Sequence, residues 1–173
     1  MKHFLMVVAA TGFIALLAQW SWQTPASLGG IPITGQSLAV LVVGMLVQKP
    51  YAVLSVGLYL LLGGLGLPIF AEGNSGWSVF AGGSGGFLFG FLAAAFLMEP
   101  LALRGWGKRF EGALLAMTLG TAVIIAMGLL RLAWLYDWPR ALEYGFYPFW
   151  KGALVKIVLG AAIVWFWEAK KKV

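Results

Sequence analysis

The chain has 173 residues, of which 61% are apolar and 10% are charged, and its mean hydropathy is +0.90. Soluble globular domains are about half apolar and a quarter charged, so this composition excludes a soluble domain and predicts an integral membrane protein. The net charge of +6 comes from scattered basic residues, a pattern that argues against a nucleic-acid partner.

Apolar segments recur along the whole chain, and each is a candidate membrane span, since a span needs about 20 predominantly apolar residues. In chain order they cover residues 4–20, 37–48, 51–67, 85–101, 112–130 and 149–167. The first is longer than the core of a secretion signal, so we expect a retained helix. The six segments leave no room for a soluble catalytic domain. We therefore expect an all-α membrane protein, a compact six-helix bundle that forms a single transmembrane domain over residues 1–173.

The distribution of basic residues predicts the orientation of this bundle. With the N-terminus inside, the inner side receives Lys2, Lys49, Arg104, Lys108, Arg109, Lys170, Lys171 and Lys172, and the outer side receives Arg131, Arg140 and Lys151. Cytoplasmic loops carry an excess of Lys and Arg, so both termini are expected in the cytoplasm and the protein in the cytoplasmic membrane, surrounded by lipid. Tryptophans near the ends of the segments fit the aromatic belts of such a protein.

Long outer loops are expected at residues 21–36, 68–84 and 131–148, whereas the inner turn after residue 48 is short. Glycines crowd the end of the second loop, at residues 82, 83, 85 and 86. Glycine allows a backbone to approach a ligand or a neighbouring helix closely. The outer face is therefore the expected place of recognition.

Several kinds of chemistry are missing from the sequence. It has no cysteine, a single histidine (His3) and no Gly-x-x-x-x-Gly-Lys-Ser/Thr phosphate-binding loop. We expect no catalytic residue, no metal site and no bound cofactor, and any ATP would have to be used by partner subunits. No pair of carboxylates lies inside a predicted span, which argues against proton pumping by this chain alone.

Four segments carry a family resemblance. Residues 30–41 read Gly-Ile-Pro-Ile-Thr-Gly-Gln-Ser-Leu-Ala-Val-Leu, and residues 59–71 include Gly-Gly-Leu-Gly-Leu-Pro-Ile-Phe-Ala. Residues 82–87 read Gly-Gly-Ser-Gly-Gly-Phe, and residues 148–156 read Pro-Phe-Trp-Lys-Gly-Ala-Leu-Val-Lys. In this order and at this spacing they resemble BioY-type proteins, the biotin-binding S components of energy-coupling-factor (ECF) transporters.

The resemblance implies biotin as the transported ligand, bound in an outward-facing pocket. It also implies two kinds of partner, a transmembrane coupling subunit and cytoplasmic ATPase subunits. The chain departs from the family pattern at Ala153, where the family has aspartate, at Gly83, where it has proline, and at Gln48-Lys49, where it has Gly-Pro. Asn74, Glu72 and Glu143 are candidates to replace the acceptor that Ala153 lacks.

Lys156 is the most informative charge, because it lies about two helical turns into the last segment, roughly 10 Å along its axis. Such a lysine faces a cavity or snorkels to the headgroups. The family motif also ends on it, so we predict that it contacts the ligand. Thr34 and Gln36 offer a hydroxyl and an amide to a cyclic urea, or they cap the following helix.

Other candidate ligand contacts are weaker. Tyr59 lies inside a span and needs a partner for its hydroxyl, which the ligand or a neighbouring helix could provide. Asn74 and Ser84 flank the glycine-rich loop, and Trp77 could pack on the ligand. Thr11 and Ala15 have the spacing of small residues at a helix contact and are candidate contacts of the coupling subunit.

Three other functions stay open at this point. The chain could be an S component for another small vitamin or a biotin precursor, which the alanine at position 153 allows. It could be an intramembrane enzyme acting on lipid, although no nucleophile with a base is apparent. It could also be a structural scaffold, which would leave Lys156 unexplained.

Overall fold

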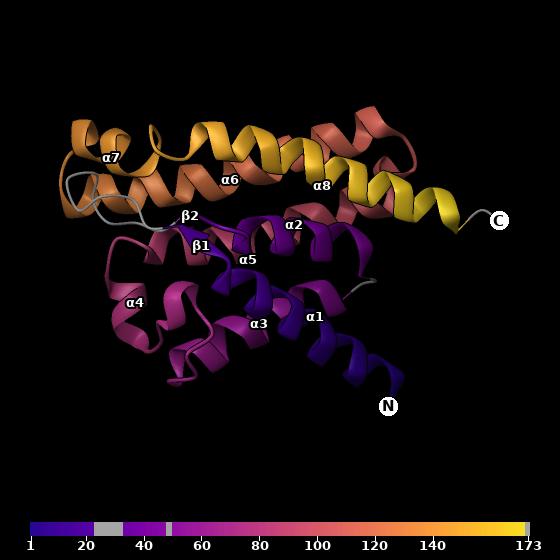
Figure 1. The fold of residues 1–173 in the computed structure, drawn as a ribbon, viewed down its shortest axis with the longest axis horizontal. Helices are drawn as coiled ribbons and strands as arrows, with labels where there is room; N and C mark the ends of the chain where they lie inside the picture. Colours follow the sequence, from indigo (N-terminus) through magenta and orange to yellow (C-terminus); the bar gives the residue numbers. More distant parts are fainter. Residues whose placement is uncertain (23–32, 48–49, 172–173) are drawn as a thin grey trace.

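The computed structural model describes residues 1–22, 33–47 and 50–171 (Figure 1). Six helices match the six predicted segments: α1 (Lys2–Gln19), α2 (Gln36–Leu46), α3 (Tyr51–Gly64), α5 (Gly85–Leu103), α6 (Phe110–Leu135) and α8 (Trp150–Lys170). Of these, α1, α5, α6 and α8 are long and apolar enough to cross a membrane, whereas α2 and α3 have 11 and 14 residues. The prediction placed residue 48 in the second helix, and this residue lies outside the described part.

The predicted outer loops contain short elements that the sequence did not indicate. They are the 3₁₀ turn η2 (Ala71–Gly73), α4 (Trp77–Ala81) and α7 (Trp138–Gly145), with a second 3₁₀ turn, η3 (Trp106–Lys108), between α5 and α6. The strands β1 (Ser21–Trp22) and β2 (Ile33–Thr34) pair antiparallel, so the fold is all-helical apart from this small ribbon. Asp137 caps α7 by accepting from the backbone N–H of Arg140 at 2.8 Å, an arrangement typical of N-cap aspartates.

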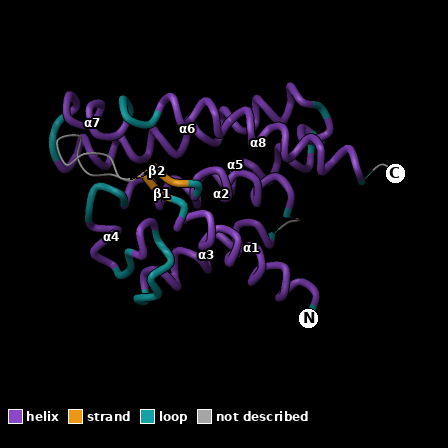
Figure 2. The backbone as a smooth tube through the Cα atoms, viewed as in Figure 1, coloured by secondary structure: helices purple, strands orange, loops and turns teal. Residues whose placement is uncertain are grey.

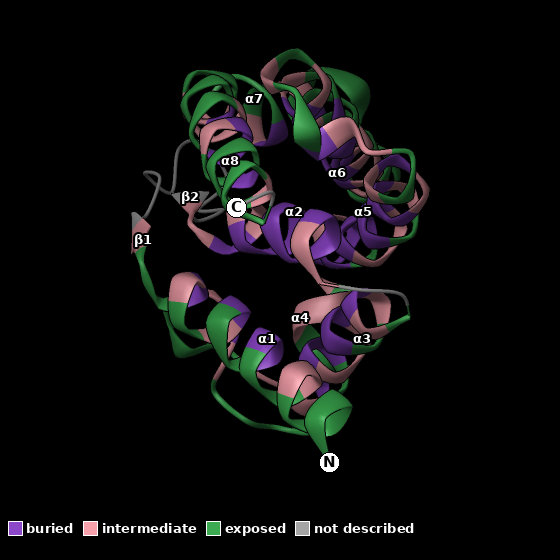
Figure 3. Cartoon of the chain, turned by 90° about the vertical axis from the view of Figure 1, so that its right-hand side faces the viewer, coloured by how far each residue is buried: buried purple, intermediate pink, exposed green. Residues whose placement is uncertain are grey.

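The short helix α2 lies in the middle of the bundle, in contact with α1, α5 and α8 (Figure 3). All of its residues from Ala39 to Met45 are buried, as expected for a helix that is apolar on every side. Close packing depends on glycine here, because a Cβ at Gly44 of α2 would lie 2.7 Å from the Cβ of Met98 of α5. On either side of α2, α1 packs on α3, and α5 packs on α6, which also contacts α8.

The two chain termini lie at the same end of the bundle (Figure 1). The strands, η2, α4 and α7 lie toward the opposite end, where the connections are longest (Figure 2). Termini at one end are what an even number of crossings requires. The side of the membrane that each end faces remains a prediction from the basic residues.

Candidate functional site

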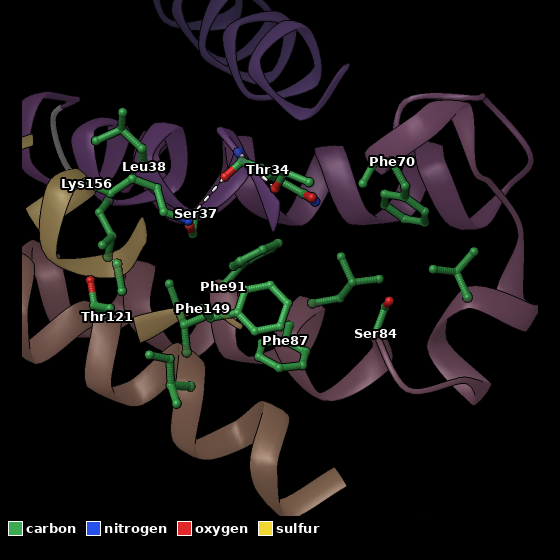
Figure 4. Close-up of a pocket in the computed structure, with 18 of the residues that line it drawn as sticks. Thr34, Ser37, Leu38, Phe70, Ser84, Phe87, Phe91, Thr121, Phe149 and Lys156 are labelled. Carbon is green, nitrogen blue, oxygen red and sulfur yellow. Dashed lines mark hydrogen bonds between the residues drawn. The ribbon is translucent and has the colours of Figure 1, made fainter. Parts of the chain in front are cut away.

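A cavity of about 200 Å³ lies between the helices (Figure 4). Most of its wall is apolar, and its polar side chains come from β2, α2, α6 and α8 and from the residues that follow η2 and precede α5. The wall consists of Thr34, Gln36, Ser37, Leu38 and Leu41; Phe70, Ala71, Asn74 and Val79; Ser84, Phe87, Leu88 and Phe91; Thr121, Ile124 and Ile125; and Phe149, Ala153 and Lys156. An apolar wall with a few placed polar groups is typical of small-molecule sites.

Lys156 reaches from α8 across to the start of α2 (Figure 4). Its Nζ donates to the backbone carbonyl of Thr34 at 3.2 Å and to Ser37 Oγ at 3.0 Å. Among the described residues of the wall, Lys156 is the one cation, and none is a carboxylate. An ammonium group held by neutral acceptors keeps its charge uncompensated by the protein, so the cavity favours a ligand with a carboxylate or a strongly polarised carbonyl oxygen.

Thr34 and Gln36 are brought together by the turn that starts α2. The backbone N–H of Gln36 donates to Thr34 Oγ1 at 3.2 Å, and Gly35 N donates to the carbonyl oxygen of Trp20 at 3.0 Å. A Cβ at Gly35 would lie 2.8 Å from the Leu17 carbonyl oxygen, so this turn needs glycine to approach α1. The turn at residues 34–36 therefore positions two side chains of the cavity wall.

Aromatic rings form much of the apolar surface. Phe87 and Phe91 of α5 and Phe149, before α8, gather beside the cavity, and Phe70 lies across from them (Figure 4). The rings of Phe87 and Phe149 are 5.8 Å apart between centroids. Such a surface suits the hydrocarbon part of an amphipathic ligand.

Arg131 of α6 holds the glycine-rich segment that follows α4. The guanidinium group donates through Nε to the Gly82 carbonyl at 3.5 Å and through Nη2 to the Ala81 carbonyl, and it lies 4.6 Å from the centre of the Trp134 ring. A Cβ at Gly85 would lie 1.9 Å from the Phe80 carbonyl oxygen. These contacts fix the position of Ser84 in the wall.

Of the residues predicted to bind ligand, Thr34, Gln36, Asn74, Ser84 and Lys156 lie in the cavity wall. This places them together but leaves their contact with a ligand a prediction.

Tyr59 and Trp77, also predicted to bind ligand, are not among the residues of the wall. Tyr59 is 0% exposed, and its hydroxyl group forms hydrogen bonds with the Gln36 side chain and the Ile69 carbonyl. Trp77 is 60% exposed at the start of α4, where its ring packs on Phe80, 5.2 Å away between centroids. Glu72 and Glu143, considered as substitute acceptors, are exposed and do not line the cavity either.

Sequence reasoning did not single out Thr121, Ser37 or the four phenylalanines of the wall, which are Phe70, Phe87, Phe91 and Phe149. Thr121 lies in the middle of α6, and a single hydroxyl in an apolar helix gives no signal by itself. Phe87 stands in the glycine-rich motif, so it could have been found from that motif. Ser37, Phe70 and Phe149 also stand in the quoted motifs, whereas Phe91 and Thr121 depend on how α5 and α6 pack.

Thr11 and Ala15 of α1 were predicted to contact a partner. Thr11 is buried, and its hydroxyl donates to the Ser55 carbonyl of α3 at 3.0 Å, so its side chain holds α1 to α3 within this chain. Ala15 is half-buried and packs against the core. The exposed small residues of α1 are instead Ala9 and Gly12, and a Cβ at Gly12 would have no neighbour within 4 Å.

Comparison with known proteins bears on this site. The model of the BioY family matches residues 1–172. The chain belongs to the BioY family. The biotin transporter BioY of Thermotoga maritima is 35% identical over 158 residues, which cover 91% of this chain and 92% of that protein. The biotin transporter BioY2 of Lactococcus lactis subsp. cremoris is 33% identical over 139 residues, 76% of this chain and 73% of the relative.

A solved structure supports the same assignment. The crystal structure of the S-component for biotin from an ECF-type ABC transporter superposes with a TM-score of 0.84 at 25% identity, covering 97% of this chain and 91% of the other. The resemblance found in the sequence motifs is therefore confirmed, and so is the all-helical membrane fold. This BioY-family chain is a multi-pass membrane protein of a transporter family and not an enzyme.

Proposed function

We propose that this chain is the substrate-binding component of an ECF-type biotin transporter, and that it captures biotin in the cavity lined by Lys156. One observation carries the proposal: the Lys156 ammonium group lies in a mostly apolar cavity. Lys156 also ends one of the segments that resemble BioY-type proteins, and the BioY family model matches this chain. Biotin has an apolar bicyclic core and chain with polar groups at both ends, a ureido carbonyl and a carboxylate. The ureido carbonyl oxygen and the carboxylate can each accept a hydrogen bond from Lys156.

Uptake against a gradient needs an energy source, and the sequence contains no nucleotide-binding loop of the Walker type. We infer that a transmembrane coupling subunit and ATPase subunits supply it. This part of the proposal rests on family membership and on the name of the solved relative.

A binding titration tests the choice of ligand. The purified chain in lipid nanodiscs should bind biotin saturably at one site. Desthiobiotin, which keeps the cyclic urea but lacks the thioether, should bind more weakly, and thiamine and riboflavin should not compete. Tighter binding of another vitamin would assign the chain to that ligand, and no saturable binding of any of them would overturn the proposal.

An uptake assay tests the partners. Cells that express the chain together with the candidate coupling and ATPase subunits should accumulate labelled biotin, and an inactive ATPase should abolish this accumulation. Equal ATP-driven uptake by the chain without those subunits would contradict the assignment of the energy source.

A further inference from the structure

A relay of two hydrogen bonds connects the cavity wall to the protein interior. The amide Nε2 of Gln36 donates to Tyr59 Oη at 2.6 Å, and Tyr59 Oη donates to the backbone carbonyl of Ile69 at 3.1 Å. Gln36 is in the wall, whereas Tyr59 is fully buried behind it. Ile69 directly precedes Phe70, which is in the wall on the other side. The relay therefore joins α2, α3 and the segment before η2.

The chemistry of the three groups dictates the direction of the relay. A backbone carbonyl can only accept, so the single hydroxyl proton of Tyr59 must go to Ile69. The Tyr59 oxygen is then an acceptor toward Gln36, and only the NH₂ end of the Gln36 amide can donate to it. If the amide were rotated by 180°, its oxygen would face a hydroxyl whose proton is already used. Burial makes such an unmatched pair costly.

The position of the Ile69 carbonyl is itself held. Gln19, at the end of α1, donates from Nε2 to the carbonyls of Ile69 at 3.2 Å and Phe70 at 3.1 Å, and it accepts from Gly73 N at 3.1 Å. The Ile69 carbonyl oxygen is therefore held within hydrogen-bond distance of the Tyr59 hydroxyl group.

The amide oxygen of Gln36 is the end that Tyr59 leaves for the cavity. A cyclic urea presents N–H donors, and a buried donor needs an acceptor. The described wall residues include no carboxylate, and position 153, on the same wall, is alanine. A neutral amide oxygen held in one orientation is the strongest remaining candidate on α2.

We propose that Tyr59 is a positioning residue for the ligand: it holds the Gln36 side chain so that Gln36 Oε1 accepts a hydrogen bond from a ureido N–H. Gln36 thereby supplies the acceptor that a carboxylate at position 153 would offer. Tyr59 itself does not touch the ligand. The inference rests on the proposed function, because it takes a cyclic urea as the bound molecule.

The test must separate this role from simple packing, because the Tyr59 ring also packs edge-on against Phe70, with 5.4 Å between ring centroids. Tyr59→Phe keeps the ring and removes only the hydroxyl. Binding of biotin is compared with binding of two biotin analogues, each methylated at one ureido nitrogen. One hydrogen bond corresponds to about a three- to tenfold change in affinity.

We expect Tyr59→Phe to weaken biotin binding by about three- to tenfold. The same variant should bind one analogue with unchanged affinity, namely the analogue that carries its methyl group on the ureido nitrogen that faces Gln36. In a Gln36→Leu background, Tyr59→Phe should have no further effect on biotin. A packing role would weaken all three ligands equally, and it would do so whether or not Gln36 is present.

Tyr51→Phe is the matched control, since Tyr51 lies on the same helix, stacks on His3 and is not in the cavity wall. An unchanged biotin affinity in Tyr59→Phe would overturn the inference while the wild-type titration still supports biotin as the ligand. If Tyr59→Phe does not accumulate in cells, Gln36→Leu alone decides. If that variant still binds biotin more tightly than both methylated analogues, to the same extent as the wild type, Gln36 accepts no hydrogen bond from the ureido group, and the inference is overturned. Wild-type protein that does not bind biotin would instead overturn the proposed function.

Discussion

Lys156 shows how one residue depends on its surroundings. It is placed in a membrane-spanning helix, where an ammonium group is costly unless it faces polar partners. Thr34 and Ser37 provide such partners, and both belong to the motif that starts α2. The two family motifs that are farthest apart in the sequence therefore meet at this single side chain.

Replacing Lys156 by methionine should weaken biotin binding by about ten- to a hundredfold, because a hydrogen bond to a charged group is worth about 1.5–3 kcal/mol. Methionine keeps most of the side-chain volume, so membrane insertion and thermal stability should change little. A titration of the variant in nanodiscs measures the effect. Lys151→Met is the control, since Lys151 is exposed beside the Trp150 ring. Equal affinities of the two variants would show that Lys156 is only an anchor.

At the scale of the elements, glycines set how closely α5 and α6 approach. A Cβ at Gly86 would lie 2.4 Å from the Met127 carbonyl oxygen and 2.4 Å from Arg131 Cβ. Backbone atoms of a helix cannot yield as a flexible side chain does. Helix packing therefore explains the glycine at position 86 of the motif at residues 82–87, in addition to the loop that precedes α5.

Gly86→Ala should destabilise the protein by about 1–3 kcal/mol, the usual cost of overpacking. A thermal unfolding curve in detergent measures it. Gly57→Ala on α3 is the control, because its Cβ would have no neighbour within 4 Å, and that variant should unfold at the wild-type temperature or slightly above. Equal melting temperatures of both variants would contradict the close approach.

The hydrogen bonds of Arg131 give a second prediction at this scale. Arg131→Ala should release the segment 81–84, and its backbone amides should exchange with solvent about tenfold faster, since charge-assisted hydrogen bonds are lost. Hydrogen exchange followed by mass spectrometry measures this. Arg140→Ala should have no such effect, because its ion pair with Asp137 is exposed and lies on α7. Unchanged exchange in Arg131→Ala would show that other contacts hold the segment.

Hydrophobic runs predicted the six apolar helices α1, α2, α3, α5, α6 and α8 to within about five residues at each end, because apolar content decides them. The short helices α4 and α7 were missed, since a few residues between glycines and prolines carry little periodic signal. The cavity residues on motifs, such as Thr34, Gln36 and Lys156, were predicted to share a site and lie in one wall. Thr121 and the interior place of Tyr59 depend on helix rotation, which apolar content does not specify.

At the scale of the whole molecule, residues 1 and 171 lie at one end of the bundle, and α4, which contributes Val79 to the cavity wall, lies toward the other (Figure 1). The basic residues predict that this end faces the cytoplasm. With that orientation, the proposed binding from outside and release inside would require the cavity to become accessible from each side of the membrane in turn.

The absence of cysteine makes this orientation directly testable. A single cysteine at position 143, in the exposed part of α7, should react with a membrane-impermeant maleimide on intact cells. A single cysteine at position 171 should react only after the membrane is permeabilised. The reverse pattern would contradict the predicted orientation, and the cysteine-free parent controls for background labelling.

The contacts of Gln19 have a mechanical consequence. This side chain, at the end of α1, donates to the carbonyls of residues 69 and 70 and accepts from the N–H of residue 73, so it ties α1 to this segment. A tilt of α1 would either move Phe70, which is in the cavity wall, or break these hydrogen bonds. If the cavity holds the ligand as proposed, a membrane partner that tilts α1 would alter the surroundings of the ligand without touching it.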